Sequence, residues 1–137
     1  MAIVTAHEVT LEFLEAFGAA WNRHDVDAIM VSMADDCVFD ITAGPDVWGK
    51  RYEGRERVRQ AVARVFSIWP DAHFASAVHF VCGDRGVSEW VFTGTREDGT
   101  RTEVNGCDLF TFRNGKIARK DSYFKNRSIA KIQDGMK

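Results

Sequence analysis

The sequence predicts an α+β fold in which helices cover one face of a strongly curved, mainly antiparallel sheet. Apolar residues recur at helical spacing in the first half of the chain, and the spacing changes to two after Pro70. The connections between the later segments are only a few residues long, which is too short for crossover helices. With 137 residues, the chain is expected to form a single domain over residues 1–137.

Helices are expected in three places in the first half of the chain. The first spans residues 8–23, where an apolar stripe faces away from acidic side chains. Residues 22–25 interrupt it, and Asp25 can cap a short second helix. The third runs from about residue 55 to 69, and Pro70 ends it.

Strands are expected mainly in the second half. An early strand at 37–42 precedes a glycine-containing loop at 43–54. Further strands are predicted over residues 72–82, 86–95, 101–113 and 116–125. Asn114-Gly115 is a strong signal for a tight hairpin. Because the turns are short, these later strands should pair antiparallel in sequential order.

Composition and charge exclude several classes of function. The formal net charge is −2, whereas a dedicated nucleic-acid-binding domain is usually strongly basic. No stretch reaches the roughly 18 apolar residues that span a bilayer, and the acidic N-terminal segment does not resemble a signal peptide. Cys37, Cys82 and Cys107 lie in apolar runs, which is typical of buried free thiols in a reducing compartment. We therefore expect a cytoplasmic protein that binds neither nucleic acid nor membrane.

Two aspartates are the candidate catalytic residues. Asp108 alternates with Phe110 and Phe112, so it should share their buried face. A carboxyl among aromatic rings loses its hydration, can stay protonated, and can then donate a hydrogen bond to a substrate oxygen. Asp40 ends the early strand and, if Val38 points inward, would face the same interior as a general base. Placed close together, the two acids would divide into one base and one acid.

Each aspartate also has a structural interpretation. Asp108 could be bonded to the backbone or to a basic side chain. Lys120 is the candidate partner, because it lies on the pocket side of the last strand if Phe124 points inward. An ion pair with Lys120 would keep Asp108 ionised and remove its role as a donor. Asp40 could instead form a turn with its own backbone.

The aromatic content, 12% of the residues, indicates an aromatic-lined cavity. The residues expected to line the substrate pocket are Phe17, Trp48, Tyr52, Trp90, Phe92, Phe110, Lys120, Ser122 and Phe124. Trp48 and Tyr52, in the long loop, are expected at its mouth. No metal site is predicted, because His73 and His79 would lie about 20 Å apart at roughly 3.3 Å per residue. No cofactor is expected either, since phosphate-loop and dinucleotide-binding motifs are missing.

Short signatures give the chain a resemblance to a known superfamily. They are NRHDVD at 22–27, ADDCVFD at 34–40, DLFTF at 108–112 and NGKI at 114–117. Together with the order of elements, they make residues 8 to 126 similar to the NTF2-like superfamily, and within it to SnoaL-like and ketosteroid-isomerase-like proteins. The resemblance implies an NTF2-like cone, in which three N-terminal helices and the curved sheet enclose a pocket.

The resemblance also carries expectations about function. It matches Asp40 to the general base of the isomerases and Asp108 to their oxyanion-hole acid. It places Phe17 where the family has an oxyanion tyrosine, and Lys120 at a position that is usually apolar. It implies a cofactor-independent acid/base enzyme for a small apolar carbonyl-type substrate, of the isomerase, cyclase or dehydratase class. The alternative is a non-catalytic module that binds a small ligand or a protein. A homodimer through the outer face of the sheet is implied as well.

Overall fold

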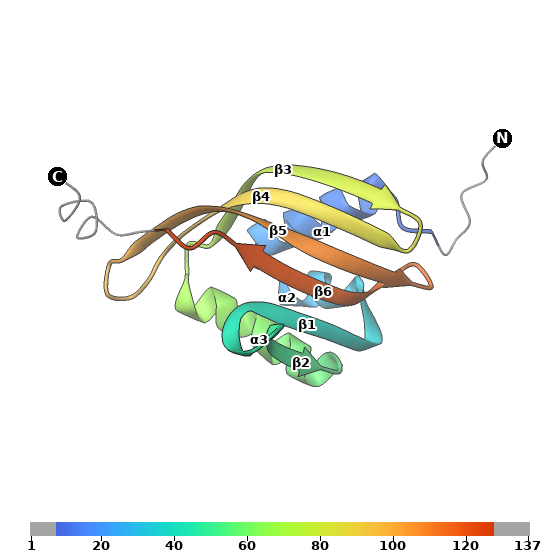
Figure 1. Cartoon of the computed structure of the whole chain (residues 1–137), viewed down its shortest axis with the longest axis horizontal. Coiled ribbons are helices and arrows are strands. Elements are labelled where there is room, and N and C mark those ends of the chain that lie inside the picture. The colour runs from blue at the N-terminus through green and yellow to red at the C-terminus, as the bar shows by residue number, and fades with distance from the viewer. Residues whose placement is uncertain (1–7, 128–137) are drawn as a thin grey trace.

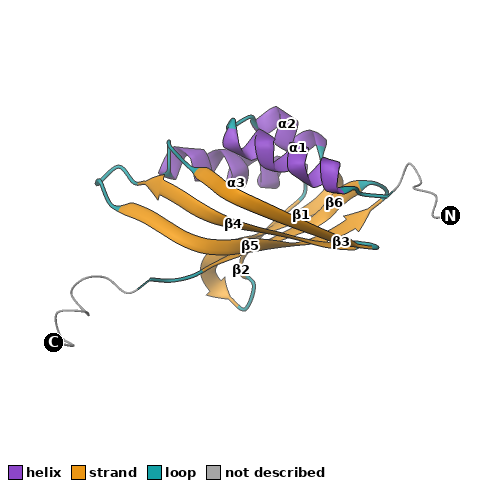
Figure 2. Cartoon of the chain, turned by 90° about the horizontal axis from the view of Figure 1, so that it is seen from above, coloured by secondary structure: helices purple, strands orange, loops and turns teal. Residues whose placement is uncertain are grey.

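The computed structural model describes residues 8–127 and has two layers, one of helices and one formed by a curved sheet. The elements in chain order are α1 (Leu11–Asn22), α2 (Val26–Val31), β1 (Met33–Asp46), β2 (Gly49–Glu53), α3 (Arg55–Ile68), β3 (His73–Cys82), β4 (Arg85–Thr95), β5 (Arg101–Arg113) and β6 (Lys116–Phe124). The helices all lie on one face of the sheet (Figures 1 and 2). The predicted α+β fold is confirmed. No helix within residues 8–127 is long and apolar enough to cross a membrane.

The sheet contains six strands in the order β2-β1-β6-β5-β4-β3. Strands β3 to β6 pair antiparallel with their neighbours in sequence, which confirms the predicted meander. β1 joins them by pairing parallel to β6, with Phe39 opposite Lys120 and Asp40 opposite Asp121. This pairing decides which face each β1 side chain occupies, because partners on neighbouring strands point to the same side of the sheet.

The segment 43–54 forms a hairpin where the sequence predicts a loop. β1 continues to Asp46, and β2 returns antiparallel beside it after a register irregularity between Ile41 and Asp46. Gly49 turns the chain with a φ of 81°, and a side chain at Gly44 would collide with the backbone of Gly49. The loop was predicted because the segment contains glycine and proline, which favour turns locally. Its pairing as two strands depends on contacts between β1 and β2, which this local signal does not contain. The hairpin places β2 at the edge of the sheet opposite to β3.

Side-chain caps start the first two helices. The Thr10 hydroxyl accepts a hydrogen bond from the Phe13 amide at 3.1 Å. The Asp25 carboxylate accepts one from the Ala28 amide at 3.0 Å, which confirms the cap predicted at Asp25.

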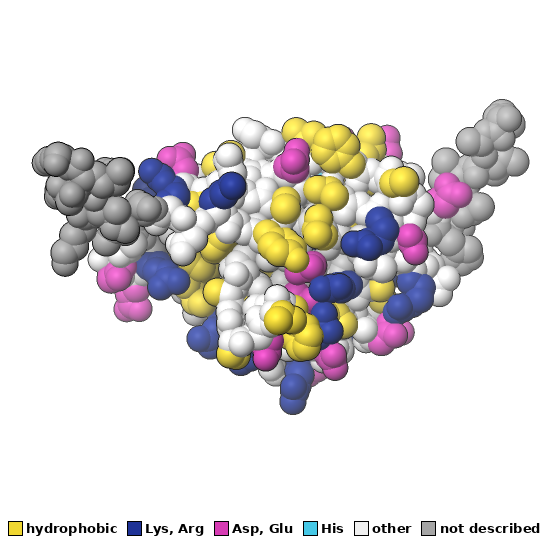
Figure 3. Space-filling model, in the orientation of Figure 1, with side chains coloured by type: hydrophobic (Ala, Val, Ile, Leu, Met, Phe, Trp, Pro, Cys, Tyr) yellow, Lys and Arg dark blue, Asp and Glu magenta, His cyan; other side chains and the backbone are white. Residues whose placement is uncertain are grey.

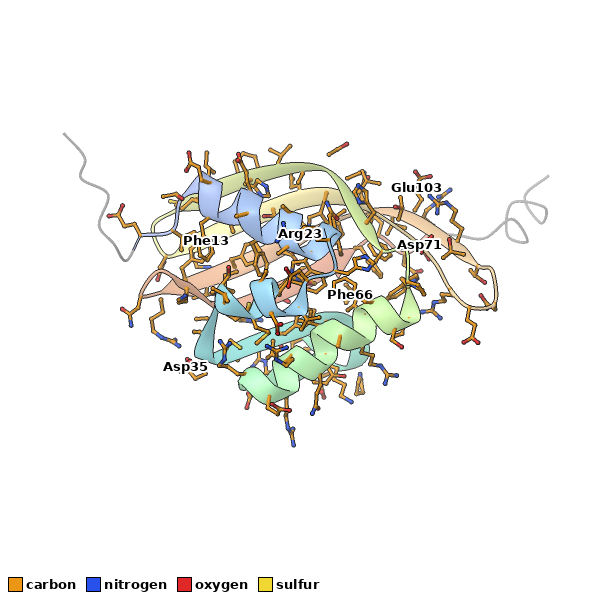
Figure 4. The ribbon with its side chains drawn as sticks, turned by 180° about the vertical axis from the view of Figure 1, so that it is seen from behind. Phe13, Arg23, Asp35, Phe66, Asp71 and Glu103 are labelled. Atoms are coloured by element: carbon orange, nitrogen blue, oxygen red, sulfur yellow. The ribbon has the colours of Figure 1, made fainter. Side chains whose placement is uncertain are left out.

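The end of α1 is fastened to β3. The Asn22 amide donates to the Phe74 carbonyl (3.0 Å), and its oxygen accepts from the Phe74 backbone N–H (2.8 Å). His24, with a φ of 57°, donates from Nε2 to the Ala72 carbonyl at 2.7 Å and stacks on the Phe66 ring at 4.2 Å between centroids. Seen from the helical side, Phe66 on α3 lies beside the end of α1 (Figure 4). These contacts hold α1 at a fixed position over the sheet.

An aromatic core fills the space between the helices and the sheet. Trp21 of α1 lies at its centre, with its ring 6.2 Å from that of Phe39, 5.3 Å from Phe66 and 5.7 Å from Phe74. Other fully buried hydrophobic side chains of this core are Leu14, Ile29, Met30, Cys37, Val58, Val62, Phe110 and Ile117. Trp21 therefore supports the core on one side and, as shown below, forms the wall of a cavity on the other.

The three cysteines are free thiols, and only Cys37 is fully buried. Burial raises the pKa of the Cys37 thiol, and it also raises that of the half-buried Cys107. Cys82 is exposed at the end of β3, so the expectation of three buried thiols is wrong for this residue. It lies in an edge strand whose outward-facing positions are open to solvent.

Gly106→Ala is expected to destabilise the fold by about 1–3 kcal/mol, because a Cβ there would collide with the Trp90 ring and lie 2.6 Å from the Tyr123 carbonyl oxygen. Gly18→Ala in α1 is the matched control. A Cβ at Gly18 meets open space, and replacing a mid-helix glycine should stabilise by about 0.5–1 kcal/mol. Urea denaturation measures both free energies of unfolding. Equal stability of the two variants would contradict the close packing of Trp90 on Gly106.

Candidate functional site

A cavity of about 530 Å³ opens between α1 and β3 and reaches inward to β4, β5 and β6, a size typical of small-molecule sites. Exposed residues line its mouth: Glu15, Ala19, His73, Ser76 and Ala77. Apolar and aromatic side chains form its walls: Leu14, Phe17, Trp21, Phe74, Trp90 and Phe110. The floor is polar and buried, and consists of Ser88, Asp108 and Lys120.

Strand register brings the polar floor together. Ser88, Asp108 and Ser122 are successive partners on β4, β5 and β6, so they form one row on the inner face of the sheet. Phe110 and Lys120 form the next row. Alternation along β5 therefore correctly predicts that Asp108 is buried, with only 6% of the residue exposed.

Asp108 accepts hydrogen bonds from three donors. Lys120 Nζ and Ser122 Oγ donate to Oδ1 at 2.9 and 2.6 Å, and Trp90 Nε1 donates to Oδ2 at 3.0 Å. An ammonium and an indole N–H can only donate, so this geometry fits an ionised carboxylate that acts as an acceptor. The expected role of Asp108 as a protonated donor is therefore contradicted, and the alternative of a pair with Lys120 is correct. Within residues 8–127, Oδ2 accepts from Trp90 alone, and Asp108 lines the cavity.

Lys120 is buried at the cavity floor between Asp108, Ser122 and two aromatic rings. Its ammonium donates to Asp108 and to Ser122 Oγ (2.8 Å), and it lies over the Trp21 and Phe39 rings at 4.6 and 4.5 Å from their centroids. Only 5% of the residue is exposed. Lys120 thus provides the positive charge of the site. Its ammonium already contacts Asp108, Ser122 and two aromatic rings.

Asp40 lies on the opposite face of the sheet from Asp108. Phe39, rather than Val38, is the inward residue of β1, since its ring packs on Trp21. Alternation then directs Asp40 outward, where it is fully buried under Arg51. The expectation that Asp40 and Asp108 share one interior as base and acid is wrong. The prediction had Val38 and Asp40 facing inward, whereas in β1 Phe39 faces inward and Asp40 faces outward.

Four of the predicted pocket residues line the cavity: Phe17, Trp90, Phe110 and Lys120. Ser122 lies below the floor, where it bonds to Asp108 and Lys120. Phe92 and Phe124 stack on each other at 5.9 Å in a second apolar cluster and do not line the cavity. These three residues pack behind the residues that line the cavity and are not part of its lining.

Trp48 and Tyr52 are not at the cavity mouth. Trp48 lies in the β1–β2 turn, is 40% exposed, and has the Arg51 guanidinium over its ring at 4.6 Å. Tyr52 on β2 packs half-buried against the core, with Lys50 over its ring at 5.4 Å. Both expectations fail because the predicted loop is a hairpin at the edge of the sheet farthest from β3, whereas the mouth lies beside β3.

A polar pair in the cavity was not predicted from the sequence. His79 of β3 has Nδ1 2.7 Å from Ser88 Oγ of β4. Alternation with Trp90 and Phe92 could have identified Ser88 as an inward residue. His79 could not be placed, because β3 has an irregular register between Ala75 and Val78 that shifts the facing of later residues. Within residues 8–127, no group of three His, Cys, Asp or Glu side chains could hold a metal ion.

Residues 14–120 match the family model of the SnoaL-like domain, which covers most of the chain. The chain belongs to the SnoaL-like family. A comparison with curated proteins found no significant match.

Solved structures share the fold of this SnoaL-like protein. A candidate polyketide cyclase from Pseudomonas putida is 22% identical with a TM-score of 0.74, covering 89% of this chain and 92% of that chain. A protein with a ketosteroid-isomerase-like fold from Catenulispora acidiphila, in complex with trimethylamine, is 23% identical with a TM-score of 0.72, covering 85% and 88%. An NTF2-like protein of unknown function from Mesorhizobium loti is 28% identical with a TM-score of 0.71, covering 91% and 98%. The NTF2-like cone predicted from the sequence is confirmed.

On its outer face, the SnoaL-like domain carries an ion-pair network centred on Asp40. Arg51 binds Asp40 with two hydrogen bonds of 2.7 and 2.9 Å, and the Arg119 Nε donates to it at 2.8 Å. The bond to Asp40 raises the pKa of Arg51. Arg119 also reaches Asp121 at 3.2 Å, and the Tyr123 hydroxyl donates to Asp121 at 3.1 Å, which raises the pKa of Tyr123. The network connects β2, β1 and β6, so the role it supports is structural.

Asp40→Asn is expected to lower the free energy of unfolding by about 1–3 kcal/mol. This is less than for a fully enclosed ion pair, because the side chains of Arg51 and Arg119 are 29% and 38% exposed and keep access to water. Asp36→Asn removes an exposed pair with Arg113 and is the control, with a loss of about 0–1 kcal/mol. Urea denaturation compares the two. A loss at Asp40 no larger than at Asp36 would contradict a structural role for the network.

Proposed function

We propose that this SnoaL-like protein is a cofactor-independent acid/base enzyme for a small, largely apolar carbonyl compound, of the isomerase, cyclase or dehydratase class. The observation that carries the proposal is the carboxylate of Asp108. Three donors fix this carboxylate at the floor of an aromatic cavity, and among the described residues its Oδ2 accepts from Trp90 alone. A fixed carboxylate that is buried at the floor of an apolar cavity is suited to remove a proton from carbon.

In this proposal Asp108 takes the role of base that sequence analysis gave to Asp40. The proton on the carbon next to the substrate carbonyl moves to Asp108 Oδ2, and the electron pair moves toward the carbonyl oxygen. Phe17, Trp90 and Phe110 would hold the apolar part of the substrate. The likeness of the fold to the candidate polyketide cyclase from Pseudomonas putida agrees with this reaction class, although a shared fold hosts many activities.

A second candidate function is that of a non-catalytic module that binds a small apolar ligand. The ion pair between Lys120 and Asp108 favours it, because a neutral pair on the floor can orient a ligand without moving a proton. The two candidates differ in one measurable respect. An enzyme exchanges the acidic C–H protons of its ligand with solvent, whereas a binding module only retains the ligand.

The test follows that exchange directly. Wild-type protein in D2O should accelerate deuterium incorporation at the α-carbon of bicyclic aromatic ketones such as 2-tetralone, measured by proton NMR. Asp108→Asn should slow the protein-catalysed rate by about 10²-fold or more, because it removes the base. Asp36→Asn, an exposed carboxylate on β1, should keep the wild-type rate.

Asp108→Asn leaves the buried Lys120 ammonium without a carboxylate partner and can therefore unfold the protein. A second variant separates loss of the base from loss of the fold. Asp108→Leu combined with Lys120→Met replaces the pair with apolar side chains and should fold while remaining inactive. Ketone binding is followed in parallel through tryptophan fluorescence, since Trp21 and Trp90 line the cavity. Tight binding without any exchange above that of these variants would reject the enzyme and leave the binding module.

We further propose that a second copy of this chain covers the outer face of the sheet. Hydrophobic side chains gather in the middle of that face, with acidic and basic side chains around them (Figure 3). Val78, Phe80 and Tyr123 are 50%, 56% and 51% exposed there. A face that carries both apolar and oppositely charged groups can pair with itself across a two-fold axis.

Phe80→Glu is expected to convert the dimer to a monomer, because it places a charge in the apolar part of the outer face. Sedimentation velocity measures the mass, which should be twice 15.5 kDa for the wild type. Val31→Glu, at an exposed apolar residue of α2 on the helical side, is the control and should stay dimeric. A monomeric wild type at micromolar concentration would refute the proposed dimer without touching the proposed activity.

A further inference from the structure

His79 and Ser88 form a polar pair that the proposed proton removal at Asp108 does not use. Their side chains meet through Nδ1 and Oγ at 2.7 Å, and both residues line the cavity. Ser88 is buried with 5% exposed, whereas His79 is half-buried nearer the mouth. The pair thus runs from the mouth of the cavity to its floor.

Strand register aligns this pair with Asp108. His79, Ser88 and Asp108 are successive partners across β3, β4 and β5. Directly opposed side chains on one face of an antiparallel pair have Cβ atoms about 4.5–5.5 Å apart. A carbonyl compound whose α-carbon lies at Asp108 Oδ2 therefore places its oxygen toward Ser88 when it lies along this row.

Proton removal from carbon needs a donor for the carbonyl oxygen, and the other floor donors are engaged. Lys120 donates to Asp108 and Ser122, and the remainder of its ammonium faces aromatic rings. The indole N–H of Trp90 also donates to Asp108. The Ser88 hydroxyl has no partner other than His79 among the described residues.

Two further donors in the cavity lining are also unsuited to this role. The side-chain amide of Asn22 is bonded to the backbone of Phe74. The indole N–H of Trp21 has no partner within the part of the chain that the structure describes, but it is fully buried, so an atom in the cavity cannot contact it. His73 and Ser76 also line the cavity, but they are exposed at its mouth. Ser88 is the strand partner of Asp108, so its hydroxyl is the donor that the geometry offers to a substrate oxygen bound at the floor.

We infer that Ser88 is a second catalytic residue and that His79 acts through it as a proton donor, an inference that rests on the proposed function. As the C–H bond breaks, its proton moves to Asp108 and its electron pair becomes the C=C bond of an enol. The former carbonyl oxygen takes the proton of the Ser88 hydroxyl, and Ser88 takes one from protonated His79. In the return step, Asp108 gives its proton to a carbon and the enol O–H proton goes back through Ser88 to His79. The cycle balances without any other reactant.

The titratable groups that line the cavity with His79 come from α1, β3, β5 and β6, whereas β4 contributes the uncharged Ser88 and Trp90. Glu15 of α1 and His73 of the same strand line the mouth, and Asp108 of β5 and Lys120 of β6 line the floor. The last two form a pair with each other, so the floor is neutral as a unit. The proposed step needs His79 in its protonated form, so the exchange rate should fall as the pH rises.

The first test is the pH profile of ketone deuterium exchange. Wild-type exchange should fall with rising pH through the titration of one group, whereas His79→Gln should be about 10- to 100-fold slower at pH 6 and lack this fall. Ser88→Ala should be slowed to a similar extent. Both variants should bind 2-naphthol within about tenfold of wild type, because the apolar walls are unchanged and only one hydrogen bond is lost. A His79→Gln profile with the wild-type fall, while Asp108→Asn is inactive, overturns this inference and leaves the proposed function standing.

A second test needs no turnover. In protein labelled with ¹⁵N-histidine, binding of 2-naphthol, whose hydroxyl stands in for that of the enol, should shift the ring-nitrogen signals of His79. The shift should be lost in Ser88→Ala. His24 is an internal reference, because its Nε2 is bonded to the Ala72 carbonyl outside the cavity lining. Saturating 2-naphthol that leaves the His79 signals unchanged would overturn the coupling whatever the exchange assay shows.

Discussion

The buried contact between Lys120 and Asp108 determines what the cavity of this SnoaL-like protein can do. A lysine with 5% exposure would be strongly unfavourable alone, but here its charge is matched by a carboxylate and by two aromatic rings. The pair turns Asp108 into an acceptor and fixes its orientation through Ser122 and Trp90. The proposed chemistry at this floor therefore begins from a carboxylate rather than from a neutral acid.

The sheet separates two acidic centres that sequence analysis had placed together. Neighbouring residues of a strand face opposite sides, so Phe39 contributes to the cage around Lys120 while Asp40 contributes to the outer network. The inner face thus carries the candidate chemistry, and the outer face carries ion pairs that hold β2, β1 and β6 together. A shift of one residue in β1 would turn Phe39 to the outer face and Asp40 to the inner face. The Asp40 carboxylate would then be buried in the core without its two arginine partners.

The position of α1 gives the cavity its shape. Asn22 and His24 fasten the end of the helix to β3 and to the residue that precedes it, and Trp21 anchors it in the core. The remaining gap between α1 and β3 is the mouth, and Gly18 leaves open space where a side chain would stand. Access to the cavity is therefore governed by the packing of a helix on an edge strand, while the residues proposed to react belong to the inner strands.

The sequence alone determined the helices, the antiparallel meander, the cap at Asp25 and the burial of Asp108. These features depend on spacing and hydrogen bonds within a few residues, which a linear pattern contains. Only the tertiary structure decided that 43–54 pairs as a hairpin, that Asp40 faces outward and that His79 meets Ser88. The facing of a strand depends on its partner and on irregularities of a single residue, and these are set by contacts between segments far apart in the chain.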